Sequence, residues 1–370
     1  MDSSRRAFLG HAAGLGAAMS VPQVTAAGDQ RLSIAAYVPS SRTQELLSSF
    51  HLKYPILQAP VGYSAGPDLA SAVCTAGAMG SMAGLTTASP DEAREKVKKV
   101  LSVTNGTFAV NYILALAAEP KSLAAVLDAG APVVQFSWGI PGSSLVATVR
   151  NAGARFGVQV ASREGARAAL DAGADYLVCQ GIEAGGHVQA SSSLLDVLAA
   201  VLLEANRQPV LAAGGIADGA DIRRVLEAGA SGAVLGTRFV ATRESYAHPD
   251  YKQALLKADN GNQTALSVCF QDGWSNALHR GLRNDTFIRW EAAGCPPAGM
   301  RPGEGDVLAT RPDGKPVLRY AALSPSKALT GDRVADCALY AGMGVGLIND
   351  LPSAGDLVRR LWAECEAAAA

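Results

Sequence analysis

The segment from residue 151 to residue 181, NAGARFGVQVASREGARAALDAGADYLVCQG, decides the fold. Ala152-Gly153-Ala154 opens it, and the same tripeptide returns as Ala172-Gly173-Ala174. An apolar run follows each tripeptide, Phe156 to Val160 after the first and Tyr176 to Gln180 after the second. Glycine just past a helix end adopts the left-handed conformation that closes the last turn, and the flanking alanines allow close packing on the next strand. The segment therefore predicts alternating β-strands and α-helices.

The same tripeptide recurs around Gly77, Gly130 and Gly229, which extends the alternation along the chain. Helical patterns such as Pro90 to Val103, with Ser89 as N-cap, lie between apolar runs. The pattern favours a closed (β/α)8 TIM barrel of the α/β class, with an open doubly wound sheet as the alternative. The eight predicted strands are Ile56 to Ala59, Ala78 to Met82, Phe108 to Asn111, Val133 to Phe136, Phe156 to Val160, Tyr176 to Gln180, Val210 to Ala213 and Ala233 to Gly236.

The composition is that of a glycine-rich globular enzyme. Of 370 residues, 49% are hydrophobic and 18% charged, which excludes disordered, collagenous and coiled-coil proteins. Because 32 basic residues face 33 acidic ones, the net charge of -1 leaves no basic excess to neutralise phosphates, and no nucleic-acid partner is expected. The 39 glycines suit tight turns and close backbone approaches to a ligand.

The amino terminus resembles a twin-arginine export signal. Arg5 and Arg6 precede a weakly apolar stretch from Ala7 to Val21, and the small residues Thr25-Ala26-Ala27 suit cleavage. The stretch is shorter than the roughly 20 residues that span a bilayer, so no permanent membrane anchor is expected. We predict that residues 1–27 are a signal peptide for the twin-arginine export machinery. The mature protein is then periplasmic or otherwise exported, and it is cytoplasmic if the signal is not used.

The remaining chain divides into three predicted parts. Residues 28–247 form the barrel. From residue 248 to residue 332 the repeat breaks down and prolines punctuate the sequence, which predicts a loop-rich insertion or small lid subdomain. Residues 333–370 are expected to form a loop and a helix, Ser353 to Glu366, that packs back on the barrel.

Glycines at two neighbouring strand ends predict a phosphate site. In such barrels, functional residues lie at the carboxyl ends of the strands, and the last two often bind phosphate through backbone N–H groups. Gly214-Gly215 ends the seventh strand and Gly236-Thr237 ends the eighth, where the threonine adds a hydroxyl donor. Glycines that only shape two turns are the alternative. The other strand ends present Ala59, Pro60, Asn111, Ser137 and Gln180.

Gly185-Gly186-His187 follows the sixth strand and contains the only histidine at a predicted strand end. A lone histidine is more often structural, but the two glycines allow the loop to fold tightly over a flat ligand. An imidazole placed there can accept a proton from carbon or stabilise an anionic substrate. His187 is therefore the candidate catalytic residue.

The cysteines and a glycine-rich segment near residue 344 give less evidence about function. The six cysteines lie far apart without a C-x-x-C motif, so no metal site is predicted and buried structural thiols are expected, although export would permit a disulfide. Gly342-Met343-Gly344-Val345-Gly346 resembles a dinucleotide fingerprint, but it lacks the flanking strands. We interpret this segment as a loop in the neighbourhood of the cofactor.

Several segments together resemble the nitronate monooxygenases. They occur in barrel order, the likeness runs from about Tyr54 to Arg360, and the segment Gln180 to His187 is the most specific. The segments are Gln58-Ala59-Pro60, Phe108 to Asn111, Gln180 to His187, Ala213 to Gly219 and Leu235 to Phe239.

The resemblance to this family implies a cofactor, a class of substrate and roles for single residues. The family is described as FMN-dependent barrels that oxidise alkyl nitronates with dioxygen and without a nicotinamide cofactor. It implies bound FMN, a small-molecule nitronate or nitroalkane as substrate, and His187 as the catalytic residue. It also implies flavin contacts from Asn111, Gln180 and Gly185, and phosphate contacts from Gly215, Gly236 and Thr237.

The chain departs from the family pattern at Ser137, where many relatives carry histidine, and at Gln189, where many carry glycine. Both positions are expected at the substrate pocket, so the natural substrate stays open. The flavin-dependent enoyl-acyl-carrier-protein reductases, which use NADH or NADPH, resemble the chain over Gly236 to Val240 and Glu244 to Lys252 and are the alternative. A non-catalytic flavin or phosphate carrier, which has no need of His187, is a further alternative.

Overall fold

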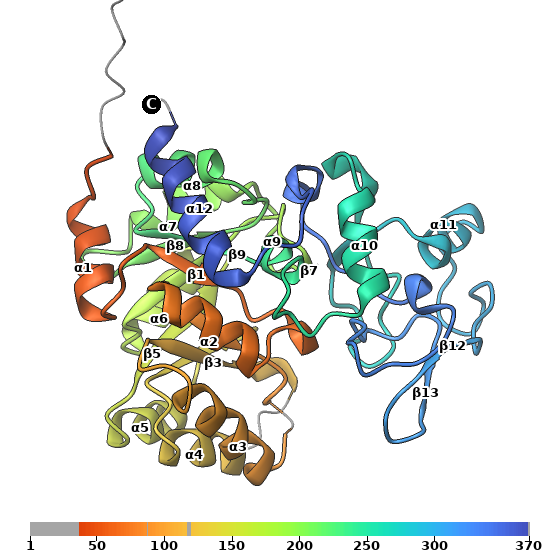
Figure 1. Cartoon of the computed structure of the whole chain (residues 1–370), viewed down its shortest axis with the longest axis horizontal. Coiled ribbons are helices and arrows are strands. Elements are labelled where there is room, and N and C mark those ends of the chain that lie inside the picture. The colour runs from red at the N-terminus through yellow and green to blue at the C-terminus, as the bar shows by residue number, and fades with distance from the viewer. Residues whose placement is uncertain (1–36, 87, 117–119, 369–370) are drawn as a thin grey trace, which may run out of the picture. The chain divides into compact units, whose positions relative to one another are not determined.

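Eight parallel strands form the central sheet (Figure 1). The computed structural model describes residues 37–86, 88–116 and 120–368, so the predicted signal peptide lies outside the described residues. A parallel bridge between Leu57 and Met79 brings the two edges of the sheet together and closes the barrel, which confirms the (β/α)8 fold. The strands, in spatial order, are β1 (Ile56–Gln58), β9 (Gly232–Leu235), β8 (Val210–Ala213), β6 (Tyr176–Gln180), β5 (Arg155–Val160), β4 (Val133–Ser137), β3 (Phe108–Ile113) and β2 (Gly80–Met82).

Helices follow the strands as the tripeptide repeat predicts. The repeat glycines have φ angles from 73° to 99°, the left-handed conformation that ends a helix. Ser89 caps its helix by accepting a hydrogen bond from the Glu92 N–H, and Pro90 takes the first helical position. These helices are α2 (Pro67–Ala76), α3 (Pro90–Leu101), α4 (Pro120–Asp128), α5 (Ser143–Asn151), α6 (Arg163–Asp171), α7 (Leu194–Leu202) and α8 (Gly219–Glu227).

The helix after the last barrel strand is short, and the carboxyl-terminal helix takes its place on the barrel. Only the four-residue α9 (Thr237–Val240) follows β9, and α12 (Ala354–Ala367) packs instead against α8 and α2. The two helices approach closely at Gly219, whose N–H donates to the Glu364 carboxylate at 3.1 Å. The segment between α9 and α12 is therefore inserted before the barrel is completed.

An apolar layer closes the amino-terminal end of the barrel. Side chains alternate along each strand, so that Ala109 and Asn111 of β3 face inward while Phe108 and Val110 face the helices. Helix α1 (Ser41–Ser49), which the sequence pattern did not single out, contributes Leu46 to the inner layer. The opposite, carboxyl end of the strands is left for a site.

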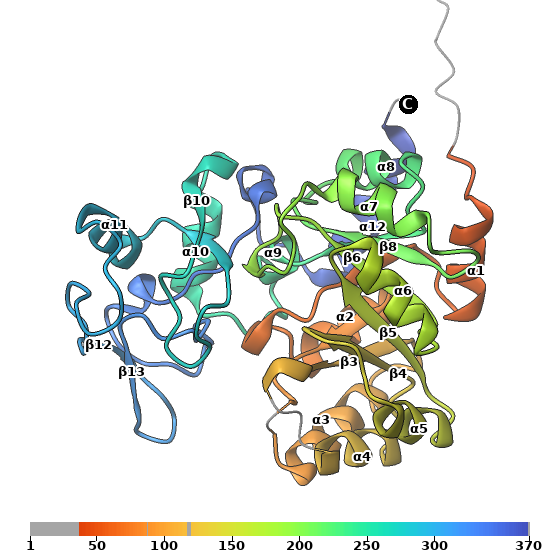
Figure 2. The same ribbon diagram turned by 180° about the vertical axis from the view of Figure 1, so that it is seen from behind.

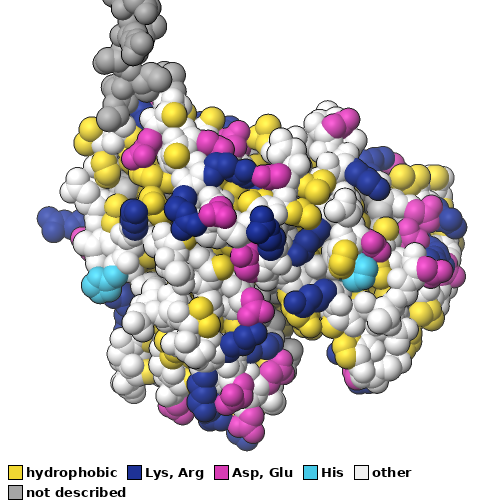
Figure 3. Space-filling model, viewed as in Figure 1, with side chains coloured by type: hydrophobic (Ala, Val, Ile, Leu, Met, Phe, Trp, Pro, Cys, Tyr) yellow, Lys and Arg dark blue, Asp and Glu magenta, His cyan; other side chains and the backbone are white. Residues whose placement is uncertain are grey.

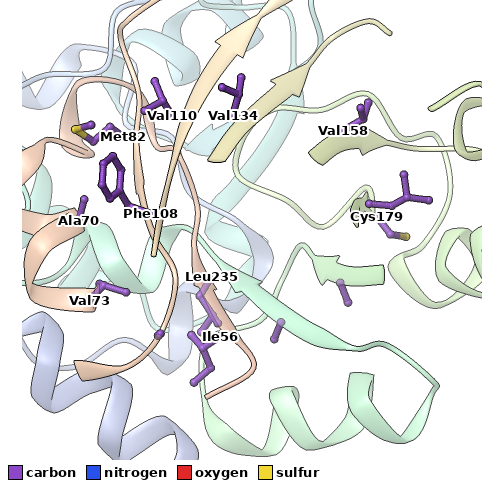
Figure 4. Close-up of a cluster of buried hydrophobic side chains, with 14 of the residues drawn as sticks. Ile56, Ala70, Val73, Met82, Phe108, Val110, Val134, Val158, Cys179 and Leu235 are labelled. Carbon is purple, nitrogen blue, oxygen red and sulfur yellow. The ribbon is translucent and has the colours of Figure 1, made fainter. Parts of the chain in front are cut away.

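The outer core lies between the strands and the helices (Figure 4). Phe108, Val110 and Val134 point out of the sheet, and α2 contributes Ala70 and Val73 to the same cluster. All of these side chains are fully buried. The helices are thus fixed to the barrel by apolar burial.

The inserted segment lies beside the barrel (Figure 2). Strands β10 (Thr264–Ser267) and β11 (His279–Leu282) form an antiparallel sheet with β7 (Gly186–His187), the short strand after β6. The segment also contains α10 (Pro249–Lys257), α11 (Asp285–Ala292) and the hairpin of β12 (Val307–Thr310) and β13 (Pro316–Leu318). Arg319 is completely buried there and pairs with Asp285, Asp306 and Asp336.

The surface carries charges of both signs. On the face in Figure 3, acidic and basic side chains are interspersed. Among the described residues, pairs such as Arg150 with Asp175 and Arg360 with Asp350 lie within ion-pair distance. In the described part of the chain, no helix has the length and apolar character needed for a membrane span.

We predict that Gly157→Ala destabilises the barrel. A methyl group at this β5 position would lie 2.1 Å from Cζ of the fully buried Tyr176, so the ring must move. We expect the free energy of unfolding, measured by urea denaturation, to fall by about 1–3 kcal/mol.

Gly165→Ala in α6 is the matched control, because its methyl group meets nothing closer than 3.5 Å. Alanine favours a helix, so the control is expected to be unchanged or up to about 1 kcal/mol more stable. Equal losses in the two variants would contradict the assignment.

Candidate active site

A cavity of about 630 Å³ opens at the carboxyl ends of the barrel strands. Its volume falls in the range typical of ligand sites. The inserted segment contributes to its walls through Trp274, Leu318 and Tyr340, among others. Every site residue predicted from the sequence lines this cavity except Gln189; those that do are Ala59, Pro60, Asn111, Ser137, Gln180, Gly185, His187, Gly214, Gly215, Gly236 and Thr237.

A hydrogen-bonded layer of amide and hydroxyl side chains lies at the floor of the cavity, and three of its four members line it, namely Asn111, Gln135 and Ser137. The Tyr176 hydroxyl donates to the side-chain oxygen of Gln135 at 3.3 Å, and the side-chain amide of Gln135 donates to the side-chain oxygen of Asn111 at 3.3 Å. The Asn111 amide donates in turn to the Ser137 hydroxyl at 3.3 Å. All four side chains are buried, and each is held by its neighbour. The chain of bonds fixes which polar atoms face the cavity.

Gln189 lies behind the cavity wall and orients two residues that line it. Its backbone N–H donates to the Gln180 side-chain oxygen at 2.9 Å, and the Gln159 amide donates to its side-chain oxygen at 2.8 Å. The Gln180 amide also donates to the His187 carbonyl oxygen at 3.2 Å. Gln180 therefore holds the loop that carries His187.

Glycine turns form one end of the cavity. Gly214 and Gly215 have φ angles of 124° and 70°, a conformation that other residues rarely adopt. A Cβ on Gly344 would lie 2.5 Å from the Gly215 carbonyl oxygen, and the Gly342 N–H donates to the Thr237 hydroxyl at 3.0 Å. The segment around Gly342 is a 3₁₀ helix against these turns, so its glycines serve close backbone packing.

His187 lies among aromatic side chains in another part of the cavity wall. Its ring stacks on Trp274 with a centroid distance of 4.0 Å and an interplanar angle of 22°. Its Nε2 atom is buried without a hydrogen-bond partner, and so is the Tyr340 hydroxyl, whose ring lies 5.3 Å away. Buried polar atoms are normally paired, so these two atoms mark a place for a polar ligand.

Three of these side chains had no predicted role. Trp138 directly follows Ser137, and its position at the end of the fourth strand is visible in the sequence. Trp274 and Tyr340 belong to the inserted segment, where no strand pattern indicated which side chains return to the barrel. Glu183 does not line the cavity; its carboxylate accepts the Leu194 N–H at 2.9 Å at the start of α7.

The family model for nitronate monooxygenase matches residues 44–124 and 115–364. A nitronate monooxygenase of Pseudomonas aeruginosa is 33% identical over 85% of this chain and 96% of its own length. The chain belongs to the nitronate monooxygenase family. The residues that line the cavity fall within the matched range.

Solved structures share the fold over nearly the whole described chain. A nitroalkane oxidase from Streptomyces ansochromogenes is 32% identical with a TM-score of 0.70, and covers 87% of this chain and 97% of its own. FabK from Thermotoga maritima is 26% identical with a TM-score of 0.71, and covers 87% of this chain and 96% of its own. Family and fold thus agree.

His279 lies next to His187 and affects the electrostatic environment of its ring. The two residues are cross-strand partners of β7 and β11, with ring centroids 5.5 Å apart. The Ala277 carbonyl oxygen accepts from Nδ1 of His279 at 3.0 Å, and the Phe270 N–H donates to its Nε2 at 3.0 Å. These partners require the neutral Nδ1–H tautomer.

Both histidines are held neutral. Burial, and then the neighbouring His279, lowers the pKa of His187 to about 3. Burial lowers the pKa of His279 to about 4. The cavity therefore presents an uncharged imidazole near pH 7.

We predict that stability falls as the pH is lowered from about 6.5 toward about 4. Histidines in the unfolded chain bind protons below about pH 6.5, whereas these two remain neutral in the folded protein, so protons favour unfolding in this window. Each histidine adds a slope of up to about 1.4 kcal/mol per pH unit. Urea denaturation at a series of pH values measures it.

His279→Gln should reduce this slope. His51→Asn is the control, because His51 is exposed and asparagine tolerates its positive φ of 52°. Identical slopes in wild type and His279→Gln would show that His279 is not the buried neutral group.

Proposed function

We propose that the protein is an FMN-dependent monooxygenase that oxidises alkyl nitronates, and nitroalkanes more slowly, with dioxygen to carbonyl compounds and nitrite. The observation that carries the proposal is the unpartnered, buried Nε2 of His187 in a cavity that a glycine cradle also lines. The family membership supports the reaction class.

The residues present fit FMN. Gly214 and Gly215 hold a turn with successive positive φ angles, a conformation in which backbone N–H groups can converge on an anion. Gly236-Thr237 lies beside them at the next strand end, and a single such cradle suits one phosphate. Asn111 and Gln180 offer amides along the floor for the flavin ring. When bound, FMN supplies the electron transfer to dioxygen that no side chain can supply.

The electrostatics of His187 favour a nitronate as the substrate form. A neutral imidazole can donate a hydrogen bond to a nitronate oxygen, and the Tyr340 hydroxyl offers a second donor. An anion at this position also raises the pKa of His187 and strengthens the hydrogen bond. Deprotonation of a neutral nitroalkane by His187 is less favourable than binding of a nitronate, because a base with a conjugate-acid pKa of about 3 is weak.

Reduction of an enoyl thioester is the second candidate. The loop from Glu183 to His187 resembles the flavin-dependent enoyl reductases, and FabK shares the fold at a TM-score of 0.71. Oxidation of NADH with an enoyl thioester, in the absence of oxygen uptake with any nitronate, would favour that reaction.

We also propose export and a lid. Arg5, Arg6 and the following apolar stretch support twin-arginine export of the folded precursor, with the signal at residues 1–27. The contribution of Trp274, Leu318 and Tyr340 to the cavity wall supports a covering role for residues 248–332 and the loop after them.

We predict that the purified protein is yellow and releases FMN, not FAD, on denaturation, as resolved by chromatography against both standards. Gly344→Ala should lower the ratio of FMN to protein, because the new methyl group would lie 2.5 Å from the Gly215 carbonyl oxygen and displace the cradle. Gly165→Ala is the control with full occupancy. Release of FAD, or unchanged occupancy in Gly344→Ala, would contradict the cradle.

We predict that His187→Ala keeps FMN but loses turnover in oxygen-uptake assays. If His187 accepts the proton of neutral nitroalkanes despite its low pKa, the loss for them should be on the order of 10² to 10⁴ fold. It should be smaller for preformed nitronates, which need only positioning and charge stabilisation. His51→Asn is the control. Near-normal rates with both substrate forms would remove His187 from the mechanism, and loss of FMN would make it structural.

A further inference from the structure

Two tryptophans from distant parts of the chain contact each other beside His187 in the cavity wall. Trp138 follows β4, and Trp274 lies in the loop between β10 and β11. Their ring centroids are 4.9 Å apart at an interplanar angle of 62°, an edge-to-face contact. Trp274 stacks on His187, and Trp138 meets the same imidazole edge-on at 6.3 Å. We call Trp138 and Trp274 the aromatic wall.

The backbone at Trp138 is held in an unfavourable conformation. Its φ angle is 58°, a region that bulky residues rarely adopt, and the adjacent Gly139 has a φ of 147°. Strain of this kind persists where the surrounding structure imposes it, and such residues cluster at ligand sites. The strained turn places Trp138 in the cavity wall.

The loop that carries Trp274 is tied by its own hydrogen bonds. The Trp274 N–H donates to the Gln271 carbonyl oxygen at 3.0 Å, and the Asn276 N–H donates to the Gln271 side chain at 3.3 Å. The β11 strand that follows pairs with β7, which carries His187. Trp274 and His187 are therefore placed by one sheet.

The charged side chains of the cavity wall are already paired. Asp272 binds Arg301, with N–O distances of 2.9 and 3.0 Å, and Arg311 lies 3.4 Å from Asp313. Asp272 and Arg311 are the only two described lining residues with a formal charge near pH 7. The apolar lining includes Ile113 and Leu116 from the end of β3 and the turn after it, and Val317, Leu318 and Leu323 from the inserted segment. The part of a substrate that extends from the reacting group therefore meets several apolar side chains, and each charged side chain of the wall has an opposite charge beside it.

We infer that the aromatic wall selects nitronates with a flat, neutral, apolar substituent, such as an aryl group. This inference rests on the proposed function and names its substrate class. An aryl ring gains edge-to-face or offset-stacked contacts with the two indoles in addition to apolar burial, and a short alkyl chain cannot make them. Trp138 and Trp274 act as specificity residues, while His187 contacts the reacting group.

The test compares phenylnitromethane nitronate with nitroethane nitronate in oxygen-uptake assays on the FMN-loaded enzyme. We expect wild type to favour the aryl nitronate in kcat/KM by about tenfold or more, and Trp274→Ala to reduce that ratio about tenfold. Trp274→Phe should recover most of it, because it restores an aromatic face. Trp362→Phe, remote from the cavity lining, is the control and should keep the wild-type ratio.

A binding measurement separates this inference from the reaction. Phenylacetate is a flat, unreactive anion that resembles phenylnitromethane nitronate, and acetate lacks the ring. Calorimetry on the holoenzyme should show about tenfold weaker phenylacetate binding in Trp274→Ala than in wild type. Wild type could consume no oxygen with any nitronate and still bind phenylacetate about tenfold more tightly than Trp274→Ala does. The proposed function would then be wrong, and the role of the aromatic wall in binding an aryl group would be supported.

Three outcomes would overturn the inference. Wild type could show no preference for the aryl nitronate, or could prefer a nitronate with a terminal carboxylate. Trp274→Ala could also lower kcat/KM equally for the aryl and the ethyl substrate, which would assign Trp274 to the support of His187 alone.

Discussion

The hydrogen-bonded layer of side chains across the barrel interior is the constraint on which the site depends. Below it the inward side chains are apolar and sealed by α1, and above it lies the cavity. Tyr176 crosses the interior to reach Gln135, and Gly157 leaves the space that the ring occupies. Because a buried amide without a partner is costly, Gln135 and Asn111 have to be satisfied from within the layer. Their fixed orientation is what presents a defined polar floor to a ligand.

The short pairing of β7 with β11 connects the inserted segment to that floor. Gln180 belongs to a barrel strand and holds the carbonyl group of His187, while His279 on β11 lies opposite His187 in the ladder. The imidazole is therefore positioned from the barrel on one side and from the insertion on the other. Burial keeps that neighbour neutral, and its hydrogen bonds to Ala277 and Phe270 fix the tautomer, so the two rings coexist without charge repulsion.

This arrangement gives one cavity two kinds of wall. Backbone packing dominates at the glycine turns, where Gly344 and Gly215 approach so closely that a side chain would not fit. Aromatic contacts dominate around His187, where Trp138, Trp274 and Tyr340 surround an unpaired nitrogen. An anionic group bound by backbone and a flat substrate bound by rings suit these two environments.

The sequence by itself determined the barrel, because its signals are local. Apolar runs, N-caps such as Ser89, and glycines such as Gly153 that close helices act within a few residues, and all eight predicted strands are present. The same logic brought Asn111, Gln180, His187 and Gly215 together, since the carboxyl ends of barrel strands meet at one face. Only the tertiary structure decided that Gln189 supports the wall from behind and that Trp274 and Tyr340 return to His187. Those contacts join segments far apart in the chain and carry no periodic signal, because they depend on how an irregular insertion pairs with one two-residue strand.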